Sequence, residues 1–403
     1  MELWQKILIG MALGVIVGAL MGESATMLQP IGTIFIRLIK MLVVPLIFFS
    51  LISGITSLKD PSSMGRMGVK AVAAYIITTV FAIVIGLSVG SIIEPGKGMD
   101  MSNSGIKVSE VSKSSSLSFS GMLLNIIPTN PLEAMVEGNI LQVIFFALLF
   151  GISLALMGER SKKIVELNNI LADVMYKMTN IVMLYAPIGV FGLMAWVAGT
   201  NGLSILMPLM KVIIATVIAI TLHVLIVYVS IIKFYLNLPV MHFFKHILDA
   251  QVVAFTTSSS SATLPVTMKV AEENLGISKT TSSFILPLGA TINMDGSALY
   301  QGVCALFIAQ AFGIDLSAID MATIVLTTTL SSIGTAGIPG AGIVMMTLIL
   351  SSVGLPIEAI ALIAGVDRIL DMLRTAINVT GDNFVALLID KSEGTFDEGK
   401  YHL

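Results

Sequence analysis

The stretch that decides the fold of this chain is SSIGTAGIPGAG at Ser331–Gly342, which interrupts an apolar segment near its middle. A second run, TTSSSSATLP at Thr256–Pro265, interrupts an earlier apolar segment, and both runs contain Ser, a small residue, Thr and then Pro. Non-helical backbone at membrane depth is tolerated only where protein or a water-filled cavity covers it. Paired interruptions predict a transport site between inverted repeats. The alternative is that each run is a surface loop joining two helices. The four flanking apolar stretches would then each have to span the membrane alone, and they are short for that purpose.

The composition around these runs indicates a membrane-embedded chain. Of the 403 residues, 56% are hydrophobic and 12% are charged, whereas a soluble domain has about 25% charged residues. The mean hydropathy is +0.96. Because a spanning helix needs roughly 20 apolar residues, the apolar stretches allow about eight full spans and some shorter segments. A net charge of −3 gives no indication of a nucleic-acid partner, and the single cysteine cannot form an internal disulfide.

Loop charges predict the orientation of the chain. The connections at 59–70 and 160–163 carry lysine and arginine, whereas those at 22–30 and 199–204 carry neither. The positive-inside rule then places the amino terminus in the cytoplasm, with the chain passing repeatedly through the cell membrane. The first apolar run has no small-residue cleavage site and is interpreted as a retained helix. The Ser- and Lys-rich stretch at 94–118 is predicted to be a flexible external linker.

The motif Asn293–Ser297, NMDGS, lies in the middle of the apolar segment at 280–312. A carboxylate inside a span is costly. Glycine and small polar neighbours indicate a local break that exposes backbone carbonyls, and carbonyl oxygens with the Asp295 carboxylate suit a hard cation such as sodium. The alternative is that Asp295 is buried against a neighbouring helix for structural reasons alone.

The last apolar segment contains DRILDMLRTAINVTGD at Asp367–Asp382. Positions 367, 371, 374, 378 and 382 step by four, three, four and four, so on a helix they form one polar stripe. Opposite charges on a stripe partly compensate each other's desolvation. Within a membrane such a stripe indicates a substrate or ion pathway, although a structural ladder of ion pairs competes with that interpretation. Arg368 is predicted to lie roughly 100° off the stripe.

The chemistry of the stripe fits a compact acidic amino acid. Arg374 offers a planar fork that matches a carboxylate, and Asp371 offers an anion for an ammonium group. Serine hydroxyls and backbone N–H groups at the interrupted runs are available for a second carboxylate. A dicarboxylate without an amino group would face Asp371 with like charge, and a neutral amino acid would leave Arg374 unpaired.

These motifs resemble the glutamate transporter family of dicarboxylate/amino acid:cation symporters, in particular the prokaryotic sodium/aspartate-glutamate symporters. The serine run, NMDG, GTAGIPGAG and DMLRTAINVTGD occur in the family's order and spacing, most specifically between Ala254 and Asp390. The resemblance implies an all-α multi-pass protein with eight transmembrane helices and two re-entrant helical hairpins arranged as inverted repeats. It also implies a homotrimer in which each protomer moves its substrate by an elevator mechanism. The hairpin tips would be Ser258–Pro265 and Ser332–Gly342.

The same resemblance implies a division of the chain. Residues 1–68 would hold scaffold helices 1 and 2, and residues 69–93 would hold helix 3 of the transport domain. Residues 94–202 would form the external loop and scaffold helices 4 and 5. The transport domain would continue through 203–403 with helix 6, hairpin 1, helix 7, hairpin 2 and helix 8.

The resemblance also implies a substrate site and three sodium sites. Arg374 would bind the side-chain carboxylate of the substrate, and Asp371 would bind its amino group. The implied substrate contacts are Ser259, Ser260, Ser297, Ala336, Gly337, Ile338, Gly342, Asp371, Arg374, Thr375 and Asn378. The implied sodium ligands are Asp382, Asn378, Gly289 and Asn293 at one position, carbonyls of Ser332, Ile333 and Thr335 at another, and Asp295, Asn293, Thr78, Thr79 and Tyr75 at the third. From the residues alone, 75–79 is an ordinary apolar helix whose threonines bond to their own backbone.

Three departures from the family pattern bear on coupling. Ser297 stands where the family often has threonine, and Ser258 and Met372 stand where many members place an extra arginine. Arg368 could serve that role from the next turn, or the role is absent.

Two function classes remain beside each other. The first is a secondary active symporter that imports L-aspartate or L-glutamate with sodium, its alternative being a proton-coupled glutamate/aspartate or C4-dicarboxylate symporter of the same fold. The second is a pore or an intramembrane enzyme, which the sequence disfavours because it has no H-E-x-x-H motif and no His or Lys base beside the serine run. We therefore expect no enzymatic activity and no organic cofactor. The expected partners are an acidic amino acid, sodium ions, the lipid bilayer and two further copies of the chain.

Overall fold

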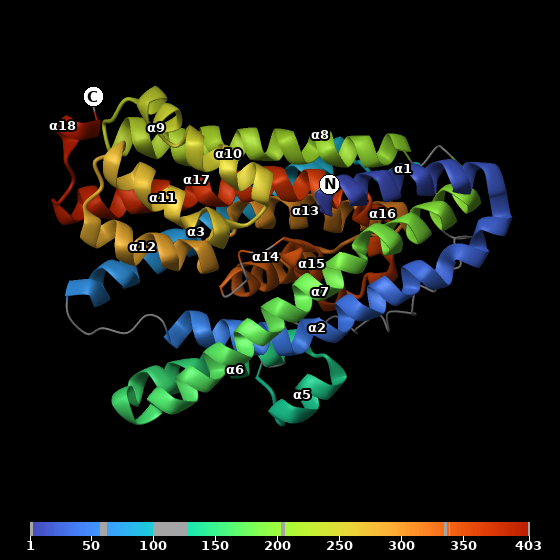
Figure 1. The fold of residues 1–403 in the computed structure, drawn as a ribbon, viewed down its shortest axis with the longest axis horizontal. Coiled ribbons are helices and arrows are strands. Elements are labelled where there is room, and N and C mark those ends of the chain that lie inside the picture. Colours follow the sequence, from blue (N-terminus) through green and yellow to red (C-terminus); the bar gives the residue numbers. More distant parts are fainter. Residues whose placement is uncertain are drawn as a thin grey trace.

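The computed structural model describes residues 3–56, 63–99, 127–202, 206–333, 337 and 339–401. Within these ranges the chain forms helices and no strand (Figure 1). Four helical stretches in the described residues are long and apolar enough to cross a membrane: Gln5–Ser53, Arg66–Ile93, Gly158–Thr200 and Met207–Tyr235. The predicted all-α class is confirmed.

A first group of helices is built from the amino-terminal half of the chain. α1 (Leu3–Met21) and α2 (Gln29–Thr56) pack along α7 (Lys162–Asn201), and α6 (Ile140–Leu156) packs on α2. Shorter elements link them: η1 (Gly22–Leu28), α5 (Pro131–Glu137) and η2 (Gly158–Ser161). Because most of the linker predicted at 94–118 lies outside the described residues, that prediction is not tested.

Small residues determine how α1 meets α7. Gly10, Gly14 and Gly18 recur every four residues, so they lie on one face of α1. A Cβ atom at these positions would come within 2.4, 2.6 and 2.3 Å of backbone oxygens of α7. Small residues at this spacing let two membrane helices approach backbone to backbone, where dispersion contacts supply the attraction that water does not.

A second group is built around α17 (Asp367–Glu393), which is buried along most of its length. α12 (Lys279–Ile292), α13 (Asp295–Ala311) and α10 (Leu248–Thr257) pack against it, and α3 (Ser63–Ile93) lies along α13. The remaining elements are α8 (Leu206–His223) with its π-helical continuations η4 (Val224–Val229) and η5 (Ile231–Tyr235), α9 (Val240–His246), α11 (Ser260–Glu273), α14 (Ala318–Ser332), α15 (Ala341–Ser352), η6 (Ile357–Ala359), α16 (Ile360–Ala364) and α18 (Glu398–Tyr401).

The apolar segments at 248–273, 279–311 and 318–352 are each divided into two helices, and these divisions fall at the polar motifs. α10 ends at Ser258, whose φ of 51° is left-handed, and Ser259 then caps α11 by accepting a hydrogen bond of 3.1 Å from the N–H of Ala262. α12 ends at Asn293, and α13 begins at Asp295. In Figure 1 the pair α10–α11 lies beside α17, and α14 and α15 lie next to each other below it.

The two groups meet mainly through α15 and α16, which pack against α2 and α7. Glycines of the second group face methionines of the first at this boundary. A Cβ atom at Gly340 would lie 2.6 Å from the sulfur of Met183, and one at Gly365 would lie 2.9 Å from Met194 and 3.1 Å from Met11. At these two points flexible thioether side chains therefore meet bare backbone.

The end of α17 is joined to the start of α12 by a buried carboxylate. Asp390 is fully buried and accepts hydrogen bonds from the backbone N–H of Ser278 (2.9 Å), the hydroxyl of Ser278 (2.6 Å) and the hydroxyl of Thr281 (2.6 Å). Ser278 is the N-cap of α12, so one side chain fixes where two long helices begin and end.

We expect Asp390→Ala to destabilise the fold by about 2 kcal/mol or more, because buried donors would lose their acceptor. The thermal unfolding midpoint can be followed through Cys304, the only cysteine and a buried one, with a thiol-reactive dye. Asp315→Ala, which removes an exposed carboxylate, is the control. Equal midpoints for the two variants would contradict the role of Asp390.

Candidate functional site

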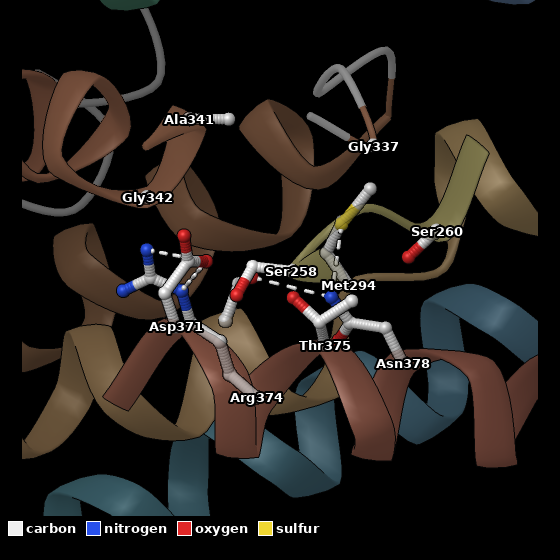
Figure 2. Close-up of a pocket in the computed structure, with 11 residues that line it drawn as sticks. Ser258, Ser260, Met294, Gly337, Ala341, Gly342, Asp371, Arg374, Thr375 and Asn378 are labelled. Carbon is white, nitrogen blue, oxygen red and sulfur yellow. Dashed lines mark hydrogen bonds and ion pairs between the residues drawn. The ribbon is translucent and has the colours of Figure 1, made fainter. Parts of the chain in front are cut away.

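A cavity lies where the ends of α10–α11 and α14–α15 meet the middle of α17 (Figure 2). Its free volume is about 10 Å³, which is room for about one water molecule. The lining residues are Ser258, Ser260, Met294, Ser297, Gly337, Ala341, Gly342, Asp371, Arg374, Thr375 and Asn378. Four interrupted segments of the sequence thus contribute to one small polar space.

Arg374 is held by carboxylates of its own helix. Its Nε donates to Asp371 Oδ1 at 2.9 Å and its Nη1 donates to Asp367 Oδ1 at 2.8 Å. Nη2 lies 2.9 Å from the same Asp371 oxygen but is not aligned to donate to it. The guanidinium also lies 4.5 Å from the ring centre of Tyr300. Ion pairs of the predicted stripe of α17 are therefore present, and the four charged side chains of the stripe, Asp367, Asp371, Arg374 and Asp382, are all buried.

Arg368 completes this cluster although it lies off the stripe. Its Nη1 is 3.6 Å from Asp371 Oδ2. The first half of α17 thus buries two arginines and two aspartates whose formal charges cancel. Such cancellation is what makes the burial of four ionised groups tolerable.

Hairpin α14–α15 closes directly over the guanidinium. A Cβ atom at Gly342 would lie 2.4 Å from Arg374 Cζ, so only glycine leaves room for the fork there. The backbone N–H of Gly340 donates to Asp371 Oδ2 at 3.1 Å. The helix-terminal backbone of α15 therefore touches both charged residues that were predicted to bind substrate.

The two hairpins are also joined to each other. The carbonyl oxygen of Gly337 accepts a hydrogen bond of 2.6 Å from the hydroxyl of Ser259 and one of 3.2 Å from the N–H of Ser261. Ser259, a predicted substrate contact, thus bonds to the opposite hairpin and does not line the cavity.

A second polar cluster lies where α12 breaks. Asn293 donates through Nδ2 to Asp382 Oδ1 (2.9 Å) and to the backbone oxygen of Asn378 (3.0 Å), while its own Oδ1 is buried without a hydrogen-bond partner. A Cβ atom at Gly289 would lie 2.5 Å from Asp382 Oδ1 and 2.6 Å from the hydroxyl of Tyr75. Predicted ligands of the first sodium position are therefore close together around an unsatisfied oxygen.

A third cluster surrounds Asp295, which is fully buried. Thr78 and Thr79, assigned with Asp295 to the third predicted sodium position, donate to its Oδ1 at 3.1 and 2.9 Å. Its Oδ2 accepts from the hydroxyl of Tyr228 at 2.7 Å and lies 3.3 Å from Nε2 of His223. Tyr75, expected in this group, instead donates to the carbonyl of Ile285 at 3.1 Å.

The remaining predicted position is only partly described. Ser332 ends α14 and donates its hydroxyl to the carbonyl of Thr329, and Ile333 follows as the C-cap. Thr335, Ala336 and Ile338 lie outside the described residues. The roles assigned to all of these residues stay predictions.

Sequence reasoning missed four residues of these clusters: Ser258, Met294, Tyr228 and His223. Ala341 lies within the predicted hairpin tip Ser332–Gly342. Ser258 and Met294 stand inside the quoted motifs, so their neighbours were a usable signal. His223 is the last residue of α8, and Tyr228 lies in η4, the π-helical segment that follows it. A single-turn π-helix often marks a functional position, but π-helical winding cannot be read from this apolar sequence.

This fold and site define a secondary transporter. The sequence profile described as the sodium:dicarboxylate symporter family matches residues 3–392, and the chain belongs to that family. It is a membrane transporter and not an enzyme.

Individual relatives fall into more than one substrate group. The chain is 38% identical to the proton/sodium-glutamate symport protein of Geobacillus stearothermophilus, over 98% of this chain and 96% of the relative. It is 38% identical to the proton/glutamate-aspartate symporter of Escherichia coli (strain K12), over 98% and 94%. It is 34% identical to the C4-dicarboxylate transport protein of Bacillus subtilis (strain 168), again over 98% and 94%.

We expect Gly342→Ala to reduce uptake of labelled aspartate into liposomes about tenfold or more. A tenfold effect corresponds to a loss of ~1.4 kcal/mol in the binding free energy of the ligand. The added methyl group would displace the guanidinium of Arg374. Gly68→Ala is the matched control, since its Cβ would meet only the outer ring atoms of Phe284, at 3.3 Å. Similar uptake by both variants would argue against a close approach of α15 to Arg374.

Proposed function

We propose that the protein is a secondary active symporter that imports L-aspartate or L-glutamate together with sodium ions. The observation that carries the proposal is the presence of two features close to each other. Arg374 and Asp371 line a cavity between two hairpin ends, and two buried carboxylates, Asp295 and Asp382, lie in clusters beside it. The family and the names of its relatives agree with a substrate of this class.

Charge balance supports coupling to a cation. Within the described residues no lysine or arginine forms an ion pair with Asp295 or Asp382, and the one basic side chain near them is His223. An isolated buried carboxylate is costly. The chain already neutralises the charges of Arg368 and Arg374 internally, so an incoming acidic amino acid adds a net negative charge. Cations bound at Asp295 and Asp382 would compensate both the protein and its substrate.

The geometry also indicates what binding requires. An acidic amino acid is far larger than a cavity of about 10 Å³, and the fork of Arg374 is directed at Asp367 and Asp371. Binding therefore needs outward movement at Gly337–Gly342 and a turn of the guanidinium toward the ligand. Asp371 would then exchange its bond from Arg374 for the ammonium group of the substrate, and Asp367 would keep Arg374 in place from behind.

The wider architecture belongs to the same proposal. The pairs α10–α11 and α14–α15 would be the two re-entrant hairpins, and eight further segments would span the membrane with the amino terminus in the cytoplasm. The helices around α17 would move as the transport domain against α1, α2, α6 and α7, in a homotrimer in the cell membrane. Support comes from the packing of the helices into two groups that share few contacts.

A proton-coupled or C4-dicarboxylate symporter is the second candidate. Two relatives carry proton in their names along with glutamate, and another carries C4-dicarboxylate. Asp371 argues against a substrate without an amino group, because such a substrate brings two carboxylates and no cation to it. Uptake of labelled aspartate, glutamate, serine and succinate into liposomes, under imposed sodium or proton gradients, separates the candidates.

We expect Arg374→Ala to abolish aspartate uptake, and Arg374→Lys to restore little of it, because lysine keeps the charge but lacks the two-pronged fork. Arg160→Ala, at an exposed arginine of η2, is the control. Aspartate uptake by Arg374→Ala at the rate of the control would refute the substrate assignment.

We expect Asp382→Asn to raise the sodium concentration for half-maximal uptake about tenfold or more, because the amide keeps the shape of the carboxylate and loses its charge. Asp315→Asn, far from the clusters in sequence and exposed, should leave the sodium response unchanged. The measurement is aspartate uptake at constant pH over a range of sodium concentrations, with a second series at constant sodium and varied pH. An unaltered sodium response in Asp382→Asn together with a changed pH response would favour the proton-coupled candidate.

A further inference from the structure

Arg37 on α2 has no role in the proposed transport site. It lies eight residues beyond the start of α2 at Gln29, and its side chain is exposed. Among the described residues it forms no ion pair or hydrogen bond. A charged side chain on a membrane helix is normally paired with an opposite charge or directed to a water-filled space. The exposed guanidinium of Arg37 therefore needs a partner that is not among the described residues.

A groove of about 390 Å³ lies against this arginine. Its described lining is Gln29, Pro30, Thr33, Ile34 and Arg37. The three polar members recur every four residues, so they form one strip along α2. Because a water molecule occupies about 30 Å³, the groove has room for a phosphate group with its ester substituents.

The strip offers donors near the amino-terminal end of α2, where η1 ends. Eight residues of helix rise roughly 12 Å, and helical side chains lean toward the amino-terminal end. The long side chain of Arg37 is therefore expected to extend along Thr33 toward Gln29. Thr33 donates its hydroxyl proton to the carbonyl of Gln29 at 3.0 Å, which leaves the guanidinium and the amide of Gln29 as the main donors to a ligand.

Apolar surface continues beside the strip. Ile34 and Met41 are 50% and 54% exposed, and with Pro30 and Arg37 they step along α2 by four, three and four residues. The outer face of α2 thus carries a cationic donor group between exposed aliphatic side chains.

We propose that this groove binds an anionic phospholipid, with its phosphate on Arg37 and Gln29 and an acyl chain along Ile34 and Met41. A guanidinium recognises phosphate oxygens in a bidentate manner. A lipid with a net negative charge supplies the counter-charge for the Arg37 guanidinium, whereas a zwitterionic lipid already carries a cation of its own. Along this face of α2 the donors Gln29 and Arg37 lie on either side of Ile34 and the exposed apolar surface continues to Met41, so the face offers contacts for both a phosphate and an acyl chain.

A carboxylate from a second copy of the chain is the competing partner. Glu133 and Glu137 on α5 are exposed and available for such a contact. A carboxylate would satisfy Arg37, but it would leave the apolar continuation at Ile34 and Met41 without a counterpart. The continuous apolar face therefore favours the lipid.

The test uses the full chain, purified in detergent and titrated with phosphatidylglycerol or phosphatidylcholine while bound lipid is counted by native mass spectrometry. We expect phosphatidylglycerol to bind about fivefold more tightly than phosphatidylcholine, the factor that one basic residue near a membrane surface provides. Arg37→Gln should lose this preference, Arg37→Lys should retain part of it, and Arg160→Gln should keep it whole. Thiol reactivity of Cys304 verifies that each variant is folded.

Two results would overturn the proposal. One is an undiminished preference for phosphatidylglycerol in folded Arg37→Gln. The other is a loss of oligomeric mass in Arg37→Gln with unchanged lipid binding, which would assign this face to a contact between copies.

Discussion

The structure depends on the neutralisation of ionised side chains inside an apolar body. Asp367, Arg368, Asp371 and Arg374 occupy two turns of one buried helix, and their charges cancel within ion pairs of 2.8 to 3.6 Å. Removing one member would leave a buried charge alone, at a cost of about 3–5 kcal/mol. The helices around α17 must therefore enclose these groups on every side but one. That remaining side lies under Gly342, where a ligand can replace an internal partner.

The same constraint explains why polar breaks and carboxylates occur together. Ser258 and Asn293 end helices, and each break frees backbone groups that need partners within the protein. Hydroxyl, amide and carboxylate side chains supply those partners. Where they leave an acceptor without a donor, as at Asn293 Oδ1, a cation is the natural completion. Broken helices and ion coupling thus arise from one requirement, the satisfaction of polar groups in a medium without water.

Periodicity in the sequence was sufficient for α17. The predicted stripe places Asp371, Arg374 and Asn378 on the cavity, with Asp367 behind the arginine. Periodicity was not sufficient for Arg368, since its long side chain reaches Asp371 from off the stripe. The partners of Asp295 were also beyond pattern reasoning, because Tyr228 and His223 belong to an apolar helix and only the three-dimensional packing brings their polar atoms to the carboxylate. The helix breaks at Ser258 and after Asn293 were predictable because Ser, Asn and Asp favour helix ends.

The boundary between the two groups of helices has a mechanical consequence. Where Gly340 and Gly365 face Met183, Met194 and Met11, flexible thioether side chains meet bare backbone, although the branched side chains of Ile7, Val190 and Ile343 also line this boundary. Unbranched thioethers can adopt a new rotamer at each step of a displacement, and bare backbone offers them a smooth track. By contrast, α1 and α7 meet backbone to backbone through Gly10, Gly14 and Gly18, a contact that any slip would destroy. The molecule thus combines a rigid backbone-to-backbone contact inside one group with contacts between the groups that can adapt to a displacement.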